Sequence, residues 1–198
     1  MKQFILLLLL AAGLASFAQG KPEGLFLNSR APEFKGKDQN GADVSLKELR
    51  KKGPVVVVFY RGNWCPYCNK ELKNLQDSLQ LLIDRKAQVV AITPETTEGI
   101  GKTIEKTGAT FPILYDADAK IARAYQVAYT LDEKTAKRYQ SFDIDLQKIN
   151  NQKGTPVLPV PAVYIINRDG AVTYRYFESD YKKRPTVAEL LAELATSR

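Results

Sequence analysis

Cys65 and Cys68 are the only two cysteines in this chain of 198 residues, and they lie in the segment YRGNWCPYCNKEL, residues 60–72. The chain has no histidine, so no imidazole can serve as a base or as a cationic partner for a thiolate. On a helix, residues i and i+3 share a face, with Cβ atoms about 5–6 Å apart. A disulfide at that spacing needs only a modest adjustment, so the first chemistry that the pair suggests is a dithiol–disulfide cycle.

The position of the pair favours a thiolate at Cys65. Residues 55–60, VVVVFY, form a continuous apolar and β-branched run, which is typical of a strand buried on both faces. Pro66 suits the first turn of a helix. Cys65 is then at a helix N-terminus, where partial positive charge stabilises a thiolate, and Arg61 adds to that charge. We expect Cys65 to be the exposed attacking thiol and Cys68 the buried thiol that resolves it.

Three other interpretations of the pair remain open. Half of a zinc site would need further ligands, and the chain offers no third cysteine and no histidine. A structural disulfide that closes only four residues would stabilise the fold by about 2 kcal/mol, less than a longer loop. The pair could also be two inert buried thiols, but its place between a buried strand and a helix argues against that.

The elements around the pair predict an α/β domain. An apolar stripe at helical spacing is followed by a strand, which completes a βαβ unit with parallel strands. In chain order we expect a helix with Leu72, Leu75, Leu79, Leu82 and Ile83 on its buried face, a strand at 88–93, a short helix from about Ile100 to Gly108, an edge strand at 111–115 and a helical segment at 119–125.

The C-terminal part predicts a hairpin and a final helix. Residues 129–157 are polar and weakly patterned, which indicates an insertion that is part helix and part loop. Strands at 162–166 and 171–177 flank NRDG, a turn signal. Thr186 and Glu189 have the spacing of a capping box at the start of the last helix. The expected fold is a central mixed β-sheet flanked by helices.

The N-terminus has the pattern of a secretory signal peptide. Lys2 precedes an apolar run from Phe4 to about Ala15, and residues 16–18, SFA, form a small-x-small cleavage site. The run is shorter than the ~20 residues of a membrane anchor. We therefore expect a signal peptide at 1–18, a single domain at 19–198 without stable membrane insertion, and export to the periplasm, the cell envelope or the medium.

The net charge is +7 at pH 7, and the basic residues are scattered along the chain. Scattered lysines and arginines are more typical of a solvated surface than of a nucleic-acid-binding patch. We therefore expect no nucleic-acid partner.

FYRGNWCPYCNKEL, residues 59–72, resembles the active-site segment of peroxiredoxin-like proteins of the alkyl hydroperoxide reductase/thiol-specific antioxidant family. Residues 31–49 resemble that family's N-terminal hairpin, and residues 158–185 resemble its later hairpin. The resemblance implies a thioredoxin-like fold, with Trp64 in the W-C-x-x-C motif. It also implies a cis Val160–Pro161 peptide bond facing the cysteines.

The sequence departs from the family pattern at several positions. Peroxiredoxins usually have a proline seven residues, and a threonine or serine three residues, before the first cysteine, where this chain has Val58 and Gly62. If Tyr164 is the aromatic residue of the later strand, Pro161 replaces the usual arginine. Phe59 replaces the aspartate that thioredoxins place six residues before the first cysteine.

The dipeptide Pro66-Tyr67 is the one that glutaredoxins carry between their cysteines. Glutaredoxin potentials are about −200 to −230 mV, more oxidising than that of thioredoxin.

The resemblance implies an oxidoreductase that reduces peroxides through Cys65 and Cys68 and is regenerated by an external dithiol of the thioredoxin type, with no metal or organic cofactor. The signal-peptide pattern implies that this enzyme is exported. One alternative is exchange with protein disulfides in the cell envelope. A non-enzymatic alternative is a binding module with a fixed Cys65–Cys68 disulfide. The sequence leaves the oligomeric state open.

Overall fold

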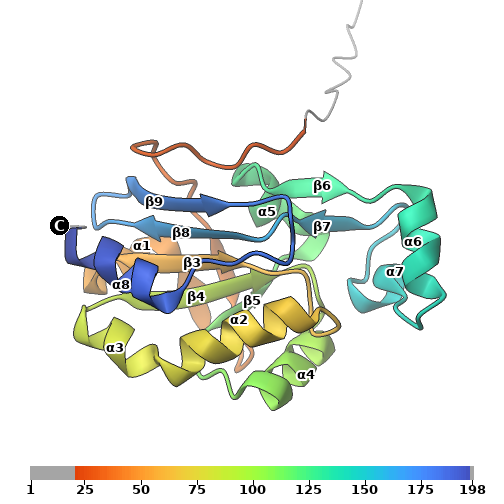
Figure 1. Cartoon of the computed structure of the whole chain (residues 1–198), viewed down its shortest axis with the longest axis horizontal. Helices are drawn as coiled ribbons and strands as arrows, with labels where there is room; N and C mark the ends of the chain where they lie inside the picture. Colours follow the sequence, from red (N-terminus) through yellow and green to blue (C-terminus); the bar gives the residue numbers. More distant parts are fainter. Residues whose placement is uncertain (1–20, 197–198) are drawn as a thin grey trace, which may run out of the picture.

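The protein is built on a five-stranded mixed sheet, shown in Figure 1 by a computed structural model that describes residues 21–196. The strands are β3 (Val55–Phe59), β4 (Gln88–Thr93), β5 (Ile113–Tyr115), β8 (Ala162–Ile166) and β9 (Val172–Phe177). Their order is β5-β4-β3-β8-β9. The first three are parallel to one another, whereas β8 is antiparallel to β3 and to β9. The predicted mixed sheet, the βαβ unit and the later hairpin are thereby confirmed.

Helices cover both faces of this sheet (Figure 1). One face carries α1 (Leu46–Lys52) and α5 (Lys120–Ala124), the second preceded by a 3-10 turn at Ala117–Ala119. The opposite face carries α2 (Pro66–Asp77), α3 (Leu79–Asp84), α4 (Thr97–Thr107) and α8 (Val187–Thr196). The cysteines belong to α2 and its N-cap, so the site lies at the edge of this second helical layer.

The smaller elements are two short antiparallel pairs and two short helices. Strands β1 (Lys35–Lys37) and β2 (Asp43–Ser45) form the predicted N-terminal hairpin. Strands β6 (Ala128–Thr130) and β7 (Val157–Pro159) pair at the base of the insertion, which also holds α6 (Glu133–Gln140) and α7 (Leu146–Ile149). The insertion is part helical, as predicted. The β6–β7 pair was not predicted, because three-residue strands carry too little periodicity.

The alternation of β3 divides the core into two clusters. Val55, Val57 and Phe59 face α1 and α5, whereas Val56 and Val58 face the helices around the cysteines. Since every residue of this strand is fully buried, a continuous apolar run is what its two-sided environment requires.

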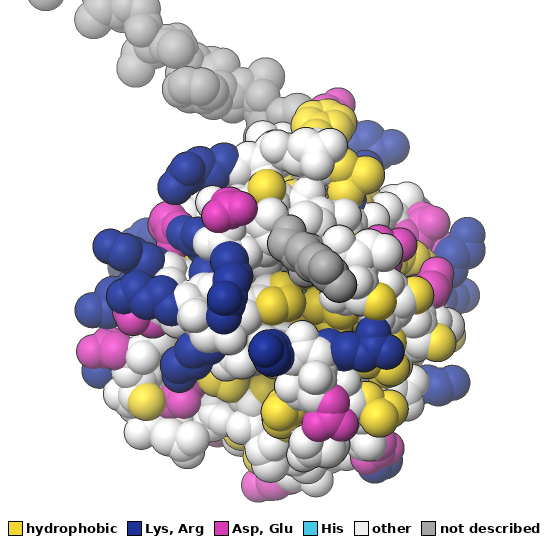
Figure 2. All heavy atoms as spheres, turned by 90° about the vertical axis from the view of Figure 1, so that its left-hand side faces the viewer, with side chains coloured by type: hydrophobic (Ala, Val, Ile, Leu, Met, Phe, Trp, Pro, Cys, Tyr) yellow, Lys and Arg dark blue, Asp and Glu magenta, His cyan; other side chains and the backbone are white. Residues whose placement is uncertain are grey.

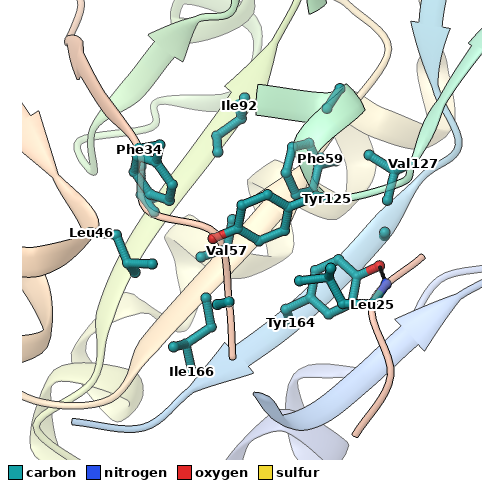
Figure 3. Close-up of a cluster of buried hydrophobic side chains, with 14 of the residues drawn as sticks. Leu25, Phe34, Leu46, Val57, Phe59, Ile92, Tyr125, Val127, Tyr164 and Ile166 are labelled. Atoms are coloured by element: carbon teal, nitrogen blue, oxygen red, sulfur yellow. Dashed lines mark hydrogen bonds between the residues drawn. The ribbon is translucent and has the colours of Figure 1, made fainter. Parts of the chain in front are cut away.

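The cluster on the α1 and α5 face is centred on aromatic rings (Figure 3). The ring centroids of Tyr125 and Phe59 are 5.1 Å apart, and those of Tyr125 and Tyr164 are 5.8 Å apart. The backbone N–H of Leu25 donates to the hydroxyl of Tyr164 at 3.1 Å, which satisfies the polar end of a buried ring. Tyr164 therefore packs on the face of the sheet opposite the cysteines.

One expected helix is in fact two. Backbone angles of φ −108° and ψ 11° at Ser78 end α2, and α3 starts at Leu79 in a new direction. Leu82 is buried as predicted, but Ile83 is 49% exposed. The spacing of the apolar residues continues across Ser78 and therefore predicts one helix. The helical backbone, however, is interrupted at Ser78.

Local stop and start signals were predicted correctly. The left-handed Gly108 (φ 69°) ends α4, and its N–H donates to the carbonyl of Ile104. At the start of α8, the hydroxyl of Thr186 accepts from the N–H of Glu189, and the Glu189 carboxylate accepts from the N–H of Thr186. This is the reciprocal capping box.

Basic and acidic side chains are mixed on the surface. On the face that Figure 2 shows, dark-blue lysine and arginine side chains gather toward one side, with magenta acidic side chains among them. Within residues 21–196, no helix has the length and apolarity needed to cross a membrane. The expected signal peptide at 1–18 lies outside the described residues.

Candidate active site

The two thiols meet at the start of α2. Cys65 is the N-cap residue, with extended backbone angles, and Pro66 occupies the first helical position. The Sγ atoms of Cys65 and Cys68 are 2.6 Å apart, with the Cys68 thiol donating to Cys65. Both residues are free cysteines. The predicted placement of the pair at a helix N-terminus is confirmed, and the two sulfurs can form a disulfide with little movement.

Cys65 is not exposed, contrary to our expectation. It is only 1% accessible, and Cys68 is fully buried. Cys65 belongs to the same buried cluster as Tyr60 and Leu72, and Trp64 packs against that cluster. The N-cap position places Cys65 at the end of a helix, but the surrounding loop and side chains exclude solvent from it.

A buried cation lies beside the thiols. Arg61 is 2% exposed, and its guanidinium carbon lies 4.7 Å from the ring centroid of Trp64, 5.6 Å from that of Tyr139 and 4.4 Å from that of Tyr181. Its Nη2 group donates to the hydroxyl of Tyr139. Such cation–π contacts are strongest where the cation is desolvated. We call Arg61 and these three rings the Arg61 cage.

The cage brings together distant parts of the chain. Trp64 follows β3, Tyr139 belongs to α6 of the insertion, and Tyr181 precedes α8. Trp64 and Tyr139 also contact each other edge-on, with centroids 5.0 Å apart. The insertion therefore contributes directly to the surroundings of the cysteines.

The two thiols have opposite acidities. The pKa of Cys65 is lowered to about 6, first by the hydrogen bond from the Cys68 thiol and then by the positive charges of Arg61 and Arg184, against the effect of burial. The pKa of Cys68 is raised, because burial and the bond to Cys65 both disfavour a second negative charge. At neutral pH the pair therefore holds one proton, on Cys68, and one thiolate, on Cys65.

An ion pair that the sequence did not predict lies beside Cys68. The Arg184 Nε group donates to a Glu71 carboxylate oxygen at 2.6 Å, and Arg184 Nη2 lies 3.4 Å from Cys68 Sγ. Burial raises the pKa of Glu71 to about 8, although Arg184 acts in the opposite direction. A signal for Glu71 was present, because it is i+3 from Cys68 on the buried stripe of α2, where a carboxyl needs a partner. No local signal pointed to Arg184.

A second buried carboxyl, Glu95, holds the loop before Cys65. Its oxygens accept from the Asn63 backbone N–H at 2.9 Å and from the Asn63 side-chain amide at 2.6 Å. Burial is the first cause that raises the pKa of Glu95 to about 7.

Gly62 has φ +147°, and a Cβ there would lie 2.5 Å from Trp64 Nε1 and 2.6 Å from Glu95 Oε1. The threonine or serine common in the family would not fit. The departure at Gly62 therefore follows from how this loop is packed.

The Val160–Pro161 bond is not cis, contrary to the resemblance, since residues 21–196 contain no cis peptide bond. A trans bond is favoured by about 0.5–1 kcal/mol before proline, and here the N–H of Val160 bonds to the carbonyl of Val127 at 2.8 Å. Val160 and Pro161 line a cavity of about 810 Å³ that Tyr129 and Tyr181 also border.

The remaining predicted residues lie around the pair or beneath it. Tyr67 is 37% exposed, with its ring against Tyr181 at a centroid distance of 5.9 Å. Val58 and Phe59 are fully buried in β3 and point to opposite faces of the sheet. Among the described residues, no group of three or more His, Cys, Asp or Glu is placed to hold a metal ion.

A mixed sheet of this topology, with a Cys-x-x-Cys pair at the N-terminus of the helix after a buried strand, defines a thioredoxin-like domain of the thiol oxidoreductase class. Residues 27–175 match the model of the AhpC/TSA family. The match covers more than half of the chain, and the protein belongs to that family.

Its relatives include two kinds of oxidoreductase. The chain is 27% identical over 117 residues to peroxiredoxin Bcp of Bacillus subtilis, which covers 59% of this chain and 73% of that protein. It is 31% identical over 131 residues to the thiol-disulfide oxidoreductase ResA of Geobacillus thermodenitrificans, covering 64% and 74%. The crystal structure of peroxidoxin BcpB from Mycobacterium tuberculosis superposes with a TM-score of 0.67 at 21% identity, covering 87% of this chain and 97% of that one.

Proposed function

We propose that the protein is a peroxiredoxin-like antioxidant enzyme that reduces peroxides through a Cys65–Cys68 dithiol–disulfide cycle. The observation that carries the proposal is the asymmetry of the pair. Cys65 has a pKa of about 6 beside the Arg61 cation, and a protonated Cys68 lies 2.6 Å away. One thiol is therefore prepared to attack, and the other is in place to resolve the product.

The proposed cycle has three steps. The Cys65 thiolate attacks one oxygen of a peroxide, the O–O bond breaks, and the leaving alkoxide or hydroxide takes a proton from solvent, which leaves Cys65 as a sulfenic acid. Cys68 then attacks the Cys65 sulfur, and water leaves as the disulfide forms. An external dithiol reduces the disulfide and is itself oxidised.

Arg61 takes over part of the role of the groups that Val58, Gly62 and Pro161 replace. Its guanidinium is close enough to Cys65 to lower the thiol pKa, and it is fully desolvated among aromatic rings. A buried cation stabilises negative charge that develops on the peroxide oxygens as the O–O bond breaks. The slight exposure of Cys65 also favours a small oxidant, which needs less rearrangement to reach the sulfur than a protein disulfide does.

Exchange with protein disulfides is the second candidate, and one observation favours it. The cavity of about 810 Å³ beside Pro161 is bordered by Phe26, Phe177 and Tyr181, and an apolar cleft of that size suits a peptide segment. The similarity to ResA is consistent with this chemistry.

The rate of Cys65 oxidation by hydrogen peroxide decides between the two candidates. We would compare it with a small thiolate of the same pKa. A single well-oriented stabilising contact is worth about a hundredfold in rate, so a rate several hundredfold above the small thiolate supports the peroxidase. A rate within about tenfold, together with fast reduction of a protein disulfide, favours the exchange enzyme. A potential below about −300 mV would instead identify a structural disulfide and a binding module.

We also propose that the protein is exported and acts in the cell envelope or outside the cell. The apolar run and SFA site at residues 4–18 support this. The mature chain is expected to begin at Gln19. Mass spectrometry of the protein from the envelope and secreted fractions tests this, and an intact Met1 there contradicts it.

A further inference from the structure

Arg184 approaches the thiol that is less acidic. Its Nη2 group lies 3.4 Å from Cys68 Sγ, within the range of a hydrogen bond to sulfur. Cys68 is fully buried, so solvent cannot stabilise a negative charge on its sulfur. A fixed cation at this distance is therefore the main local source of stabilisation whenever Cys68 becomes a thiolate.

The two remaining nitrogens of the guanidinium, Nε and Nη1, hold it in place. Nε donates to Glu71 at 2.6 Å, and Nη1 donates to the carbonyls of Tyr181 and Lys183 at 2.5 and 2.6 Å. These contacts leave Nη2 directed at Cys68. A group fixed before the reaction loses little entropy when it binds a new charge, so the arrangement is suited to a thiolate that forms only transiently.

Glu71, the partner of Arg184, leaves part of the positive charge of Arg184 available. Burial raises the pKa of Glu71 and so disfavours its negative charge, which therefore offsets the charge of Arg184 only in part while the 2.6 Å bond orients the guanidinium. A buried ion pair is by itself weak evidence for a stabilising role. The contact of Arg184 Nη2 with the Cys68 sulfur gives this pair a chemical use.

We infer that Arg184 is a catalytic residue that stabilises the Cys68 thiolate released when an external dithiol reduces the Cys65–Cys68 disulfide. The inference rests on the proposed redox cycle. An external thiolate bonds to Cys65, the Cys65–Cys68 bond breaks, and its electron pair goes to Cys68. The second thiol of the reductant then displaces Cys65, and Cys68 takes up the proton which that thiol releases. Arg184 equally stabilises the Cys68 thiolate when it attacks in the opposite direction.

The test is the second-order rate at which dithiothreitol reduces the oxidised full-length protein, followed by the fluorescence of Trp64, the only tryptophan. Since a leaving thiol of lower pKa leaves faster, Arg184→Met is expected to slow reduction by roughly tenfold or more. Arg184→Lys keeps the charge and should recover part of the rate. Arg184→Gln keeps hydrogen-bond donors without charge, and should be slow like Arg184→Met.

Arg50→Met is the matched control. Arg50 has the same side-chain exposure as Arg184, 11%, and also pairs with a glutamate, Glu33. It belongs to α1, on the opposite face of the sheet. Its loss should leave the reduction rate unchanged.

A second readout separates chemistry from packing. In a Cys65→Ser background, the pH at which Cys68 becomes alkylated should rise when Arg184 is replaced by Met and should not move in Arg50→Met. If the parent protein cycles but Arg184→Met is reduced at the parent rate, this inference is wrong and the proposed function stands. If all the arginine variants, Arg50→Met included, slow reduction equally, Arg184 is only structural. If dithiothreitol reduces no Cys65–Cys68 disulfide in the parent, both proposals fail.

Discussion

The two sides of the cysteine pair hold arginines in contrasting surroundings. Arg61 lies among three aromatic rings and a tyrosine hydroxyl, and none of the ion pairs found within residues 21–196 includes it. Arg184 is bonded to a carboxyl. An aromatic ring stabilises a cation without cancelling its charge, whereas a carboxylate can cancel it. The thiol on the aromatic side, Cys65, is the acidic one.

The comparison shows how a site without histidine can separate two identical thiols. The hydrogen bond within the pair is the first cause that lowers the pKa of Cys65, whereas burial is the first cause that raises the pKa of Cys68. In the proposed cycle, Arg61 favours attack by Cys65 and Arg184 favours release of Cys68.

Replacing the cysteines tests the division itself. Cys65→Ser is expected to abolish turnover, because it removes the thiolate. Cys68→Ser should react once and stop at a sulfenic acid or mixed disulfide on Cys65, which intact-mass spectrometry would detect. Equal residual activity in the two variants would contradict this division of roles, and an adduct found only in Cys65→Ser would reverse it.

Arg61→Met should raise the Cys65 pKa above about 6 and slow peroxide reduction by roughly ten- to a hundredfold, the loss typical of one charge-stabilising contact. The pH dependence of Cys65 alkylation measures the pKa. Arg184→Met is the comparison, since it should move the Cys65 pKa less than Arg61→Met does. Equal shifts in both variants would show that the two arginines are not specialised.

Glu95→Gln tests whether the buried Glu95 carboxyl, which bonds to Asn63 in the loop before Cys65, makes the stability of the fold depend on pH. The folded pKa of Glu95 is about 7, above its ordinary value of 4.5. The folded state therefore keeps a proton that the unfolded state releases, and stability falls as pH rises from about 4.5 to 7. Chemical denaturation at both pH values should show that Glu95→Gln reduces this fall by about 2 kcal/mol. If the free energy of unfolding falls equally between the two pH values in the parent and in the variant, Glu95 is not the group responsible.

Tyr139→Phe should have the smallest effect. It removes the hydroxyl that accepts from Arg61 and leaves the ring in the Arg61 cage. The expected loss is about 1 kcal/mol of unfolding free energy, typical of one hydrogen bond, with a small change in the Cys65 pKa. A loss of activity as large as that of Arg61→Met would mean that the hydroxyl itself takes part in the reaction.

Much of this architecture can be predicted from local patterns in the sequence. Runs and spacings within a few residues predict the strand at 55–59, the place of Cys65 at a helix N-terminus and the turn of the later hairpin. The burial of Cys65 could not be predicted that way, because solvent is excluded by side chains brought from elsewhere in the chain. Arg184 and Tyr139 lie 116 and 74 positions from Cys68 and Cys65 respectively, so only the tertiary fold reveals them.

The burial of Glu71 and Glu95 has a consequence for how this protein can be observed. Most proteins exchange protons between pH 6 and 8 through histidines spread over the surface, and this chain has none. Here Cys65, Glu95 and Glu71, with pKa values of about 6, 7 and 8, fall in that interval. All three lie on or next to the segment that bears the cysteines. Cys65, Glu95 and Glu71 therefore contribute to proton uptake and release near neutrality, and oxidation of Cys65, which removes a titratable thiol, should change the buffering capacity of the protein in this interval.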